Sequence, residues 1–168
     1  MTQEGGPAGG LVRGTDATPL IEGPLGAFLL AGGRRTSGTV SFVIHTLAPR
    51  ALGSPVHTHR REDEWSYVLE GSVGFELAGE TSVAVVDDLV LKPRGVAHAF
   101  WNAGDEPARL LEVITPSGFE GYFERLADAM SGGPPDVDLL AQIAGAYGLD
   151  IDPSSIARLA RAHDLRMG

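Results

Sequence analysis

Hydrophobic and polar residues alternate in a series of short runs between residues 27 and 113. In the run SFVIHTL, for example, Val43, His45 and Leu47 fall on one face of an extended strand, because successive side chains of a strand point to opposite sides. Gly, Pro and Asp residues separate the runs at close spacing, which is typical of β-sandwiches and β-barrels. The pattern predicts an all-β domain over residues 19–116.

The hydrophobic period changes in the segment 117–168, where apolar residues recur every three to four positions. Ser117 and Glu120 have the spacing of a capping box at the start of a helix. Two further helices are predicted, one over residues 137–147 and one that begins at Pro153. We therefore expect a helical tail that packs on the β domain or at a dimer interface.

Composition and charge narrow the class of protein. The 168 residues include 13 basic and 22 acidic side chains, and the net charge of −9 opposes binding to a nucleic-acid backbone. There are no cysteines, which excludes disulfides and thiolate metal sites. No apolar run approaches the ~18 residues of a membrane span, and the start MTQEGGPAGG lacks the features of a signal peptide. We expect a cytoplasmic protein without membrane or nucleic-acid partners, and a flexible arm over residues 1–18.

Two of the five histidines lie one residue apart in the run VHTH, and a glutamate begins the next run. In an extended strand His57 and His59 point to the same face, and Glu64 could approach them from a neighbouring strand. Imidazole and carboxylate ligands together suit Fe, Mn, Ni, Cu or Zn. The histidine pair alone could equally be two solvated side chains. A second stretch, DLVLKPRGVAHAFWN, adds His98 at the start of another β run and favours the metal site.

These two stretches resemble the paired motifs of the cupin superfamily. The first motif is G-x5-H-x-H-x3–4-E-x6-G, and the second is G-x5-P-x-G-x2-H-x3-N. The matching residues of this chain are His57, His59, Glu64, Gly71, Pro93, Gly95, His98 and Asn102. The opening glycines differ, because Ala51 holds the first position, with Gly53 two residues later, and Asp87 holds the second. These differences affect the turns and leave the ligands in place.

The resemblance is to small single-domain cupins of the cupin_2, quercetinase-like type. It implies an all-β fold, with a single cupin β-barrel (jelly roll) followed by C-terminal α-helices. It also implies that His57, His59, Glu64 and His98 bind one divalent transition metal, without selecting Fe, Mn, Ni, Zn or Cu. Glu64 could act as a general base as well as a ligand.

Strand alternation extends the prediction to the lining of a pocket around the metal. The residues expected to face inward are Val43, His45, Leu47, Ser66, Val68 and Phe100. Most of them are apolar, which suits an aromatic or other largely apolar small molecule. For His45, a hydrogen-bonded core histidine is preferred over a proton carrier near the metal.

Three kinds of function fit this site. A metal-dependent dioxygenase or related oxidoreductase is preferred, because open coordination positions on a redox-active ion suit oxygen chemistry. The alternatives are a metal-dependent isomerase or hydrolase, and a non-catalytic binding module with a structural metal. We also expect a homodimer, since strand edges near residues 27–30 and the helix near residues 119–130 need to be covered.

Overall fold

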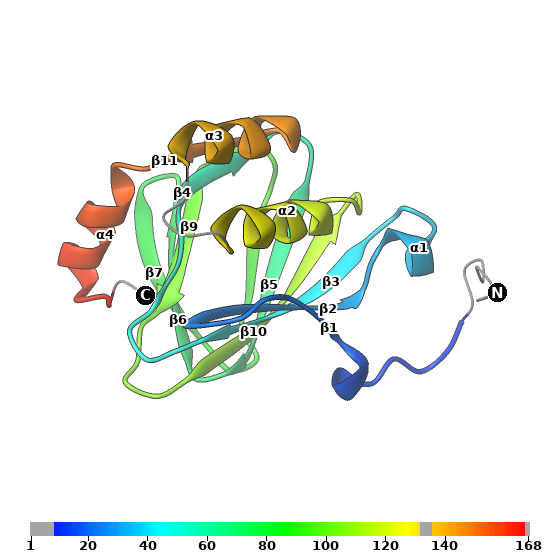
Figure 1. The fold of residues 1–168 in the computed structure, drawn as a ribbon. Coiled ribbons are helices and arrows are strands. Elements are labelled where there is room, and N and C mark those ends of the chain that lie inside the picture. The colour runs from blue at the N-terminus through cyan, green and yellow to red at the C-terminus, as the bar shows by residue number, and fades with distance from the viewer. Residues whose placement is uncertain (1–8, 132–135, 167–168) are drawn as a thin grey trace.

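The computed structural model describes residues 9–131 and 136–166, and Figure 1 shows its ribbon. The strands are β1 (Thr18–Ile21), β2 (Leu25–Ala31), β3 (Ser41–Leu47), β4 (Leu52–His59), β5 (Asp63–Glu70), β6 (Ser72–Leu77), β7 (Glu80–Val85), β8 (Leu89–Lys92), β9 (His98–Asn102), β10 (Ala108–Thr115) and β11 (Leu149–Asp152). The helices are the short 3₁₀ turn η1 (Gly14–Asp16), α1 (Gly33–Thr36), α2 (Glu120–Met130), α3 (Val137–Ala146) and α4 (Ser155–His163).

The strands form two antiparallel sheets that face each other. One sheet has the order β1-β2-β3-β10-β5-β8, and the other has the order β11-β4-β9-β6-β7. The β runs expected from the alternation appear as the strands β2 to β10. This confirms the prediction of an all-β jelly roll followed by C-terminal helices.

The alternation of side chains sets the interior of the jelly roll. Along β3 every second residue is buried, and the residues between them are half-buried. Leu47, Val68 and Leu110 of one sheet pack in one core cluster with Phe75 and Phe100 of the other. Full burial of an apolar side chain stabilises a fold by ~1.5–3 kcal/mol. This shared core therefore holds the two sheets together.

Strand β9 is buried on both faces, which alternation alone does not predict. All of its residues are buried, because α4 lies along the outer side of the sheet that contains β4 and β9 (Figure 1). There Trp101 packs with Leu159 and Leu165. Its indole also stacks on the His163 ring, with the ring centroids 4.1 Å apart. His163 therefore serves packing in this fold.

The segment after residue 117 differs from the predicted helical tail, because it contains a strand. β11 follows α3 and pairs antiparallel with β4, with Leu149 opposite His59 and Ile151 opposite His57. A run of four residues is too short to show a strand period in the sequence. The tail thus extends the sheet that carries two of the predicted metal ligands.

The helix starts also differ in detail from the predicted caps. Glu120 does not form a capping box with Ser117, because its carboxylate accepts a hydrogen bond from the hydroxyl of Ser41 at 2.6 Å. This long-range contact ties the start of α2 to the first residue of β3. α4 begins at Ser155, two residues after the predicted start at Pro153.

The N-terminal arm is described only in part. Residues 1–8 lie outside the described residues, and β1 begins at Thr18, where it pairs with β2. Because β2 lies between β1 and β3, residues 27–30 are not at a sheet edge. They do not need the cover that the dimer expectation assumed.

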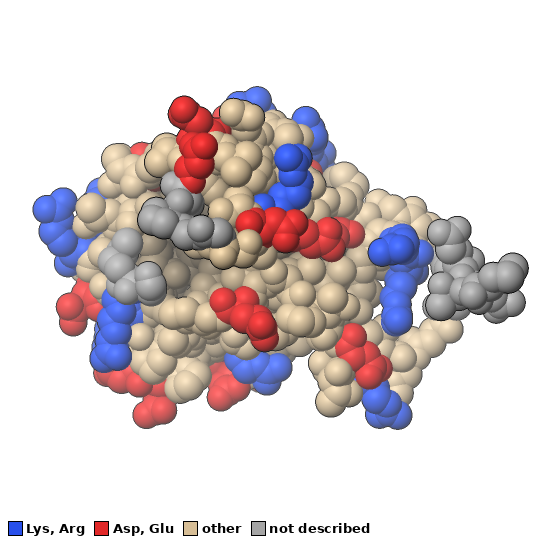
Figure 2. Space-filling view, viewed as in Figure 1, with Lys and Arg blue, Asp and Glu red and all other residues tan. Residues whose placement is uncertain are grey.

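Charged side chains are spread over the face of the molecule shown in Figure 2, with Lys and Arg interspersed among Asp and Glu. Within residues 9–131 and 136–166, no helix is long and apolar enough to cross a membrane. The cytoplasmic location stays a prediction.

Candidate metal centre

Four side chains converge between the two sheets, where the sequence predicts a metal site. His57 and His59 come from β4, Glu64 from β5 and His98 from β9. Each offers one ligand atom, and these atoms all lie within 4.8 Å of one another. The Nε2 atoms of His59 and His98 lie 3.3 Å and 3.1 Å from the two carboxylate oxygens of Glu64. Residues that are distant along the chain thus share one centre.

The backbone orients two of the three imidazoles. His57 and His98 lie opposite each other in the pairing of β4 with β9. In both rings the Nδ1 atom lies 2.9 Å from the carbonyl oxygen two residues earlier, at Pro55 and Val96 respectively. A carbonyl oxygen only accepts a hydrogen bond, so each Nδ1 carries the proton. Each Nε2 then keeps its lone pair for a metal.

The turns that deliver the ligands depend on particular backbone positions. Gly95 has a φ of +79°, and its amide donates to the carbonyl of His59 at 2.8 Å. Asp87, which stands at a motif glycine, has a φ of +75°, a left-handed conformation that Asp tolerates better than most residues. Gly53 lies so close to the Phe100 ring that a Cβ atom there would come within 2.3 Å of it. Neither departure from the motif displaces a ligand.

A fifth residue, Glu62, supports the third imidazole. Its place in the charged stretch RRED is typical of a solvated loop, but only 7% of its surface is exposed. A carboxylate oxygen of Glu62 lies 3.4 Å from Nδ1 of His59. Neither atom has a hydrogen-bond partner of good geometry among the described residues. The pair is placed for a carboxylate–histidine–metal arrangement, in which the carboxylate orients the ring toward the ion.

The electrostatics keep the ligand groups in the state that binds a cation. Burial, followed by the neighbouring imidazoles, lowers the pKa of His57 well below its usual value. Burial also lowers the pKa of His98, although the neighbouring Glu64 carboxylate, which favours the protonated ring, opposes this shift. For Glu64, burial opposes ionisation, but the Lys92 ammonium and the histidines outweigh it and hold the pKa of its carboxyl well below the usual range. Such a carboxylate is a good ligand and a poor general base.

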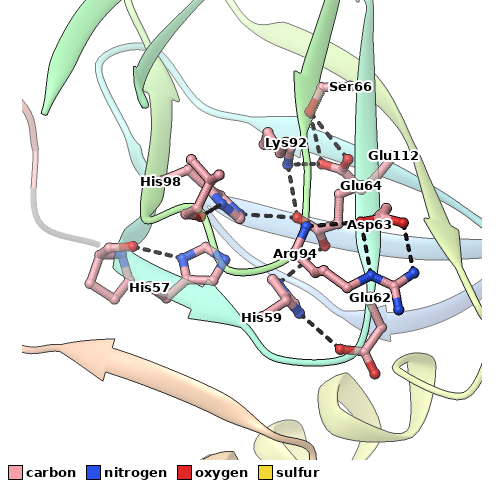
Figure 3. A network of polar contacts seen from close by, with 12 residues as sticks. His57, His59, Glu62, Asp63, Glu64, Ser66, Lys92, Arg94, His98 and Glu112 are labelled. Carbon is pink, nitrogen blue, oxygen red and sulfur yellow. Dashed lines mark hydrogen bonds and ion pairs between the residues drawn. The ribbon is translucent and has the colours of Figure 1, made fainter. Parts of the chain in front are cut away.

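A buried charge network lies behind Glu64, as Figure 3 shows, and sequence reasoning missed it. The Lys92 ammonium lies 3.0 Å from Glu64 and 2.7 Å from Glu112. The hydroxyl of Ser66 donates to Glu112 at 2.9 Å. For Lys92, burial favours the neutral amine, but the two carboxylates outweigh it and raise the pKa of the ammonium. Burial raises the pKa of Glu112.

The donor set fits a divalent transition metal. Ligand atoms bound at about 2.1 Å and at right angles lie about 3 Å apart, close to the 3.1 Å and 3.3 Å found between Glu64 and the two imidazoles. The Nε2 atom of His59 is buried without a hydrogen-bond partner among the described residues. Leaving that atom unpaired is costly unless an ion takes its lone pair. Four protein ligands also leave positions free on a six-coordinate ion.

A cavity of about 120 Å³ is lined by three of the four ligands, His57, His59 and Glu64. Most of its remaining wall is apolar, and the segment after the β domain supplies six of these residues: Phe119 just before α2, Tyr122, Phe123 and Leu126 of α2, and Leu149 and Ile151 of β11. The ring of Phe119 also packs edge-on against that of His59, with the centroids 4.4 Å apart. A cavity of ~150 Å³ holds one benzene molecule. The enclosed space therefore suits a molecule of about one ring.

The residues predicted to line the pocket fall into two groups. His45 and Phe100 line the cavity. The other four are buried but belong to the packed interior away from the cavity: Val43, Leu47, Ser66 and Val68. Alternation assigns each residue to a face of its strand, but it does not say how far along that face the cavity extends. This is why the prediction included four residues that do not line the cavity.

His45 is a buried histidine in the cavity wall. Its ring lies near those of Phe100 and Phe123, with centroids 5.5 Å and 5.6 Å away. Its Nδ1 atom lies 3.3 Å from the carbonyl oxygen of Gly26. Burial, followed by the positive charge of Lys92, lowers the pKa of His45 to about 4. The residue is therefore neutral at neutral pH and hydrogen-bonded within the core.

The comparison with protein families places a known domain on the strands that carry the site. The family described as "Cupin domain" matches residues 43–114. A curated relative, the polyketide synthase CurC of Streptomyces cyaneus, is 32% identical over 92 residues. The match covers 53% of this chain and 60% of the length of CurC.

Solved structures share the fold at low sequence identity. KdgF from Halomonas sp. has a TM-score of 0.57 at 21% identity, covering 66% of this chain and 96% of KdgF. A predicted oxalate decarboxylase from Thermotoga maritima has a TM-score of 0.58 at 23% identity, covering 63% and 98% of the two chains. The Bacillus subtilis oxalate decarboxylase, which has Mn(II) centres, has a TM-score of 0.52 at 22% identity, covering 60% and 28%. This chain is therefore a small cupin-domain protein, with a four-residue site suited to a metal and a C-terminal segment that lines the cavity beside it.

Proposed function

We propose that this protein is a metal-dependent dioxygenase or related oxidoreductase that acts on an aromatic or other largely apolar small molecule. The observation that carries the proposal is the convergence of four side chains suited to a metal, three of which line a largely apolar cavity. When bound, a redox-active Fe, Mn, Ni or Cu ion would supply the electron transfer that oxygen chemistry needs. The Mn(II) centres of the Bacillus subtilis decarboxylase support a redox ion in this fold.

The residues of the cavity wall would bind and orient the substrate. Phe100, Phe119 and Phe123 offer ring faces or edges for contact with an aromatic molecule. The volume of about 120 Å³ limits the enclosed part of the substrate to about one ring. The apolar wall also keeps bulk water away from the ligands, which strengthens electrostatic interactions inside.

Metal analysis followed by oxygen consumption tests the proposal. Protein purified without added metal is analysed for bound elements and then loaded with Fe(II), Mn(II), Ni(II) or Cu(II). We expect one ion per chain and oxygen uptake with single-ring diols such as catechol. Uptake should be lost in the double variant His57→Ala, His98→Ala. Absence of oxygen uptake with every ion, across a broad panel of aromatic compounds, would contradict an oxidoreductase.

A non-catalytic module that binds a small molecule around a structural metal is the second candidate. The observation that favours it is the weak basicity of the groups beside the cavity. The pKa of His45 is about 4 and that of Glu64 lies well below its usual range, so neither is an effective base at neutral pH. The same observation counts against an isomerase or hydrolase. Tight binding of an aromatic ligand by the metal-loaded protein, without its conversion, would identify the binding module.

We also propose that the protein is a homodimer. The outer face of the β5–β8 pair exposes Leu69, Leu89 and Leu91 by 37%, 57% and 58%, and β8 lies at the end of its sheet. An apolar face beside an edge strand can pair with its own copy about a two-fold axis. Light scattering after size exclusion should give twice the chain mass of 17.6 kDa. Leu91→Asp should give the monomer, and a monomeric wild-type protein would contradict the dimer.

A further inference from the structure

Lys92 places a positive charge in a cavity wall whose other residues are apolar, acidic, histidine or serine. Its Nζ atom lies 3.0 Å from Glu64, 2.7 Å from Glu112 and 5.6 Å from the centroid of the Phe100 ring (Figure 3). Lysine is almost never fully buried unless it is paired, and Lys92 is only 2% exposed. Among the described residues that line the cavity, it is the one Lys or Arg.

Folding alone does not account for this buried charge. Taking an ion out of water costs several kcal/mol, and the replacement of buried ion pairs by apolar residues of similar volume often leaves stability unchanged or higher. Uncharged residues at positions 92 and 112 together would fill a similar volume without that cost. The position of the ammonium at the cavity, beside Glu64, points instead to what the site binds.

A count of charges shows what the loaded site would lack. A divalent ion contributes two positive charges and Lys92 one, whereas Glu64 and Glu112 contribute one negative charge each when ionised. Imidazoles that bind an ion are neutral. Among the groups that line the cavity, one positive charge therefore remains, or two when Glu112 is protonated; the negative charge of Glu62 lies behind His59 and does not line the cavity. A positive charge that faces an apolar cavity is unfavourable, and an anionic oxygen on the ligand would offset it.

We propose that Lys92 is a specificity-determining residue, which makes the site select an apolar, ring-sized molecule with one anionic oxygen over its neutral analogue. The apolar body of the ligand would contact Phe100 and the side chains of α2, which line the same cavity as Lys92. Phenolates, ring enolates and aromatic carboxylates have this chemistry. The inference rests on the metal site of the proposed function, and it requires no turnover.

Binding of benzoate and benzamide to the Zn²⁺-loaded protein tests the inference. The two ligands have nearly the same size and differ in charge, and Zn²⁺ excludes redox turnover. By calorimetry we expect benzoate to bind at least about tenfold more tightly than benzamide. Lys92→Met should reduce this preference to within about twofold. Glu112→Gln, which removes a negative charge and keeps the shape, should increase it, whereas a purely structural ion pair would make both variants change in the same direction.

The affinity for Zn²⁺ is measured before the ligands are added, and the unfolding temperature of each variant is recorded. Failure of the wild-type protein to bind Zn²⁺ would overturn the metal site and the proposed function with it. Zn²⁺ binding without a preference for benzoate, including no binding of either ligand, would overturn the role of Lys92 alone. If Lys92→Met does not fold, an unchanged preference in Glu112→Gln would overturn it equally.

Discussion

The metal ligands and the wall of the cavity beside them come from different parts of the chain. All four ligands lie within residues 43–114, the region that matches the cupin domain. Much of the apolar wall comes from α2 and β11, which lie outside that region. The jelly roll therefore supplies the metal ligands, and the C-terminal segment shapes the space for the bound molecule. Metal binding and ligand choice should therefore respond to different substitutions.

The largest effect is expected from removing one ligand. His98→Ala should weaken metal binding by at least about 100-fold, because it removes one of four donors from a buried site. Competition with a chelator measures the affinity. The matched wall variant Leu126→Ala should leave the metal affinity unchanged within about threefold. Equal losses of metal affinity in the two variants would contradict the separation of the metal ligands from the cavity wall.

The next effect concerns the residue that orients His59. Glu62→Gln should weaken metal binding by about 10- to 100-fold, because the carboxylate beside Nδ1 holds the ring in position. Glu70→Gln, which replaces an exposed glutamate of β5, is the control and should leave the metal affinity unchanged. The same chelator competition reads out both variants. An unchanged affinity in Glu62→Gln would mean that the ring is fixed by packing alone.

A further effect concerns the stability of the metal-free protein in acid. His45 has a pKa of about 4 in the fold and ~6.5 when unfolded, so the unfolded state takes up the proton first as the pH falls. Its contribution, present above pH 6.5, should be reduced by about 2 kcal/mol at pH 5 and lost progressively toward pH 4. His45→Asn should remove this part of the pH dependence. Denaturant unfolding of both proteins at pH 7.5 and pH 5 gives the free energy of unfolding at each pH. An equal change of that free energy in the two proteins would contradict the burial of a neutral imidazole at position 45.

The smallest effect is expected from enlarging the wall. Phe123→Ala should cost ~1–3 kcal/mol of stability, because the ring is half-buried against the core. It should raise the affinity for 2-naphthoate relative to benzoate by about threefold or more, since the cavity gains room for a second ring. Leu139→Ala, on the exposed side of α3, is the control. An unchanged ratio of the two affinities in the Zn²⁺-loaded protein would mean that α2 does not limit the size of the ligand.

The strands and the metal ligands could be predicted because both follow from the spacing of residues that are close together in the sequence. The strands β2 to β10 follow from alternation and from turn residues between the runs. His57 and His59 are two residues apart on one strand, so their common direction follows from the strand period. The positions of Glu64 and His98 in the two motifs predicted that they join this pair, and in the fold all four side chains lie at one centre.

The rest of the site depends on contacts between distant segments, for which single residues give no signal. Lys92 and Glu112 lie 20 residues apart and meet only when β8 and β10 flank β5. Glu62 has the appearance of a loop residue until the turn after β4 folds it against His59. β11 is a strand because β4 offers it an edge, and its own four residues carry too little pattern to predict it. The cavity wall was therefore the part least accessible from sequence.

X-ray absorption of the protein loaded with one equivalent of Zn²⁺ tests the central claim most directly. If four side chains of this jelly roll hold one ion, the spectrum should show three imidazole nitrogens and a carboxylate oxygen at ~2.0–2.2 Å. The imidazole signal should decrease by one in His98→Ala. A spectrum with fewer than three imidazoles, or one that His98→Ala leaves unchanged, would contradict the account.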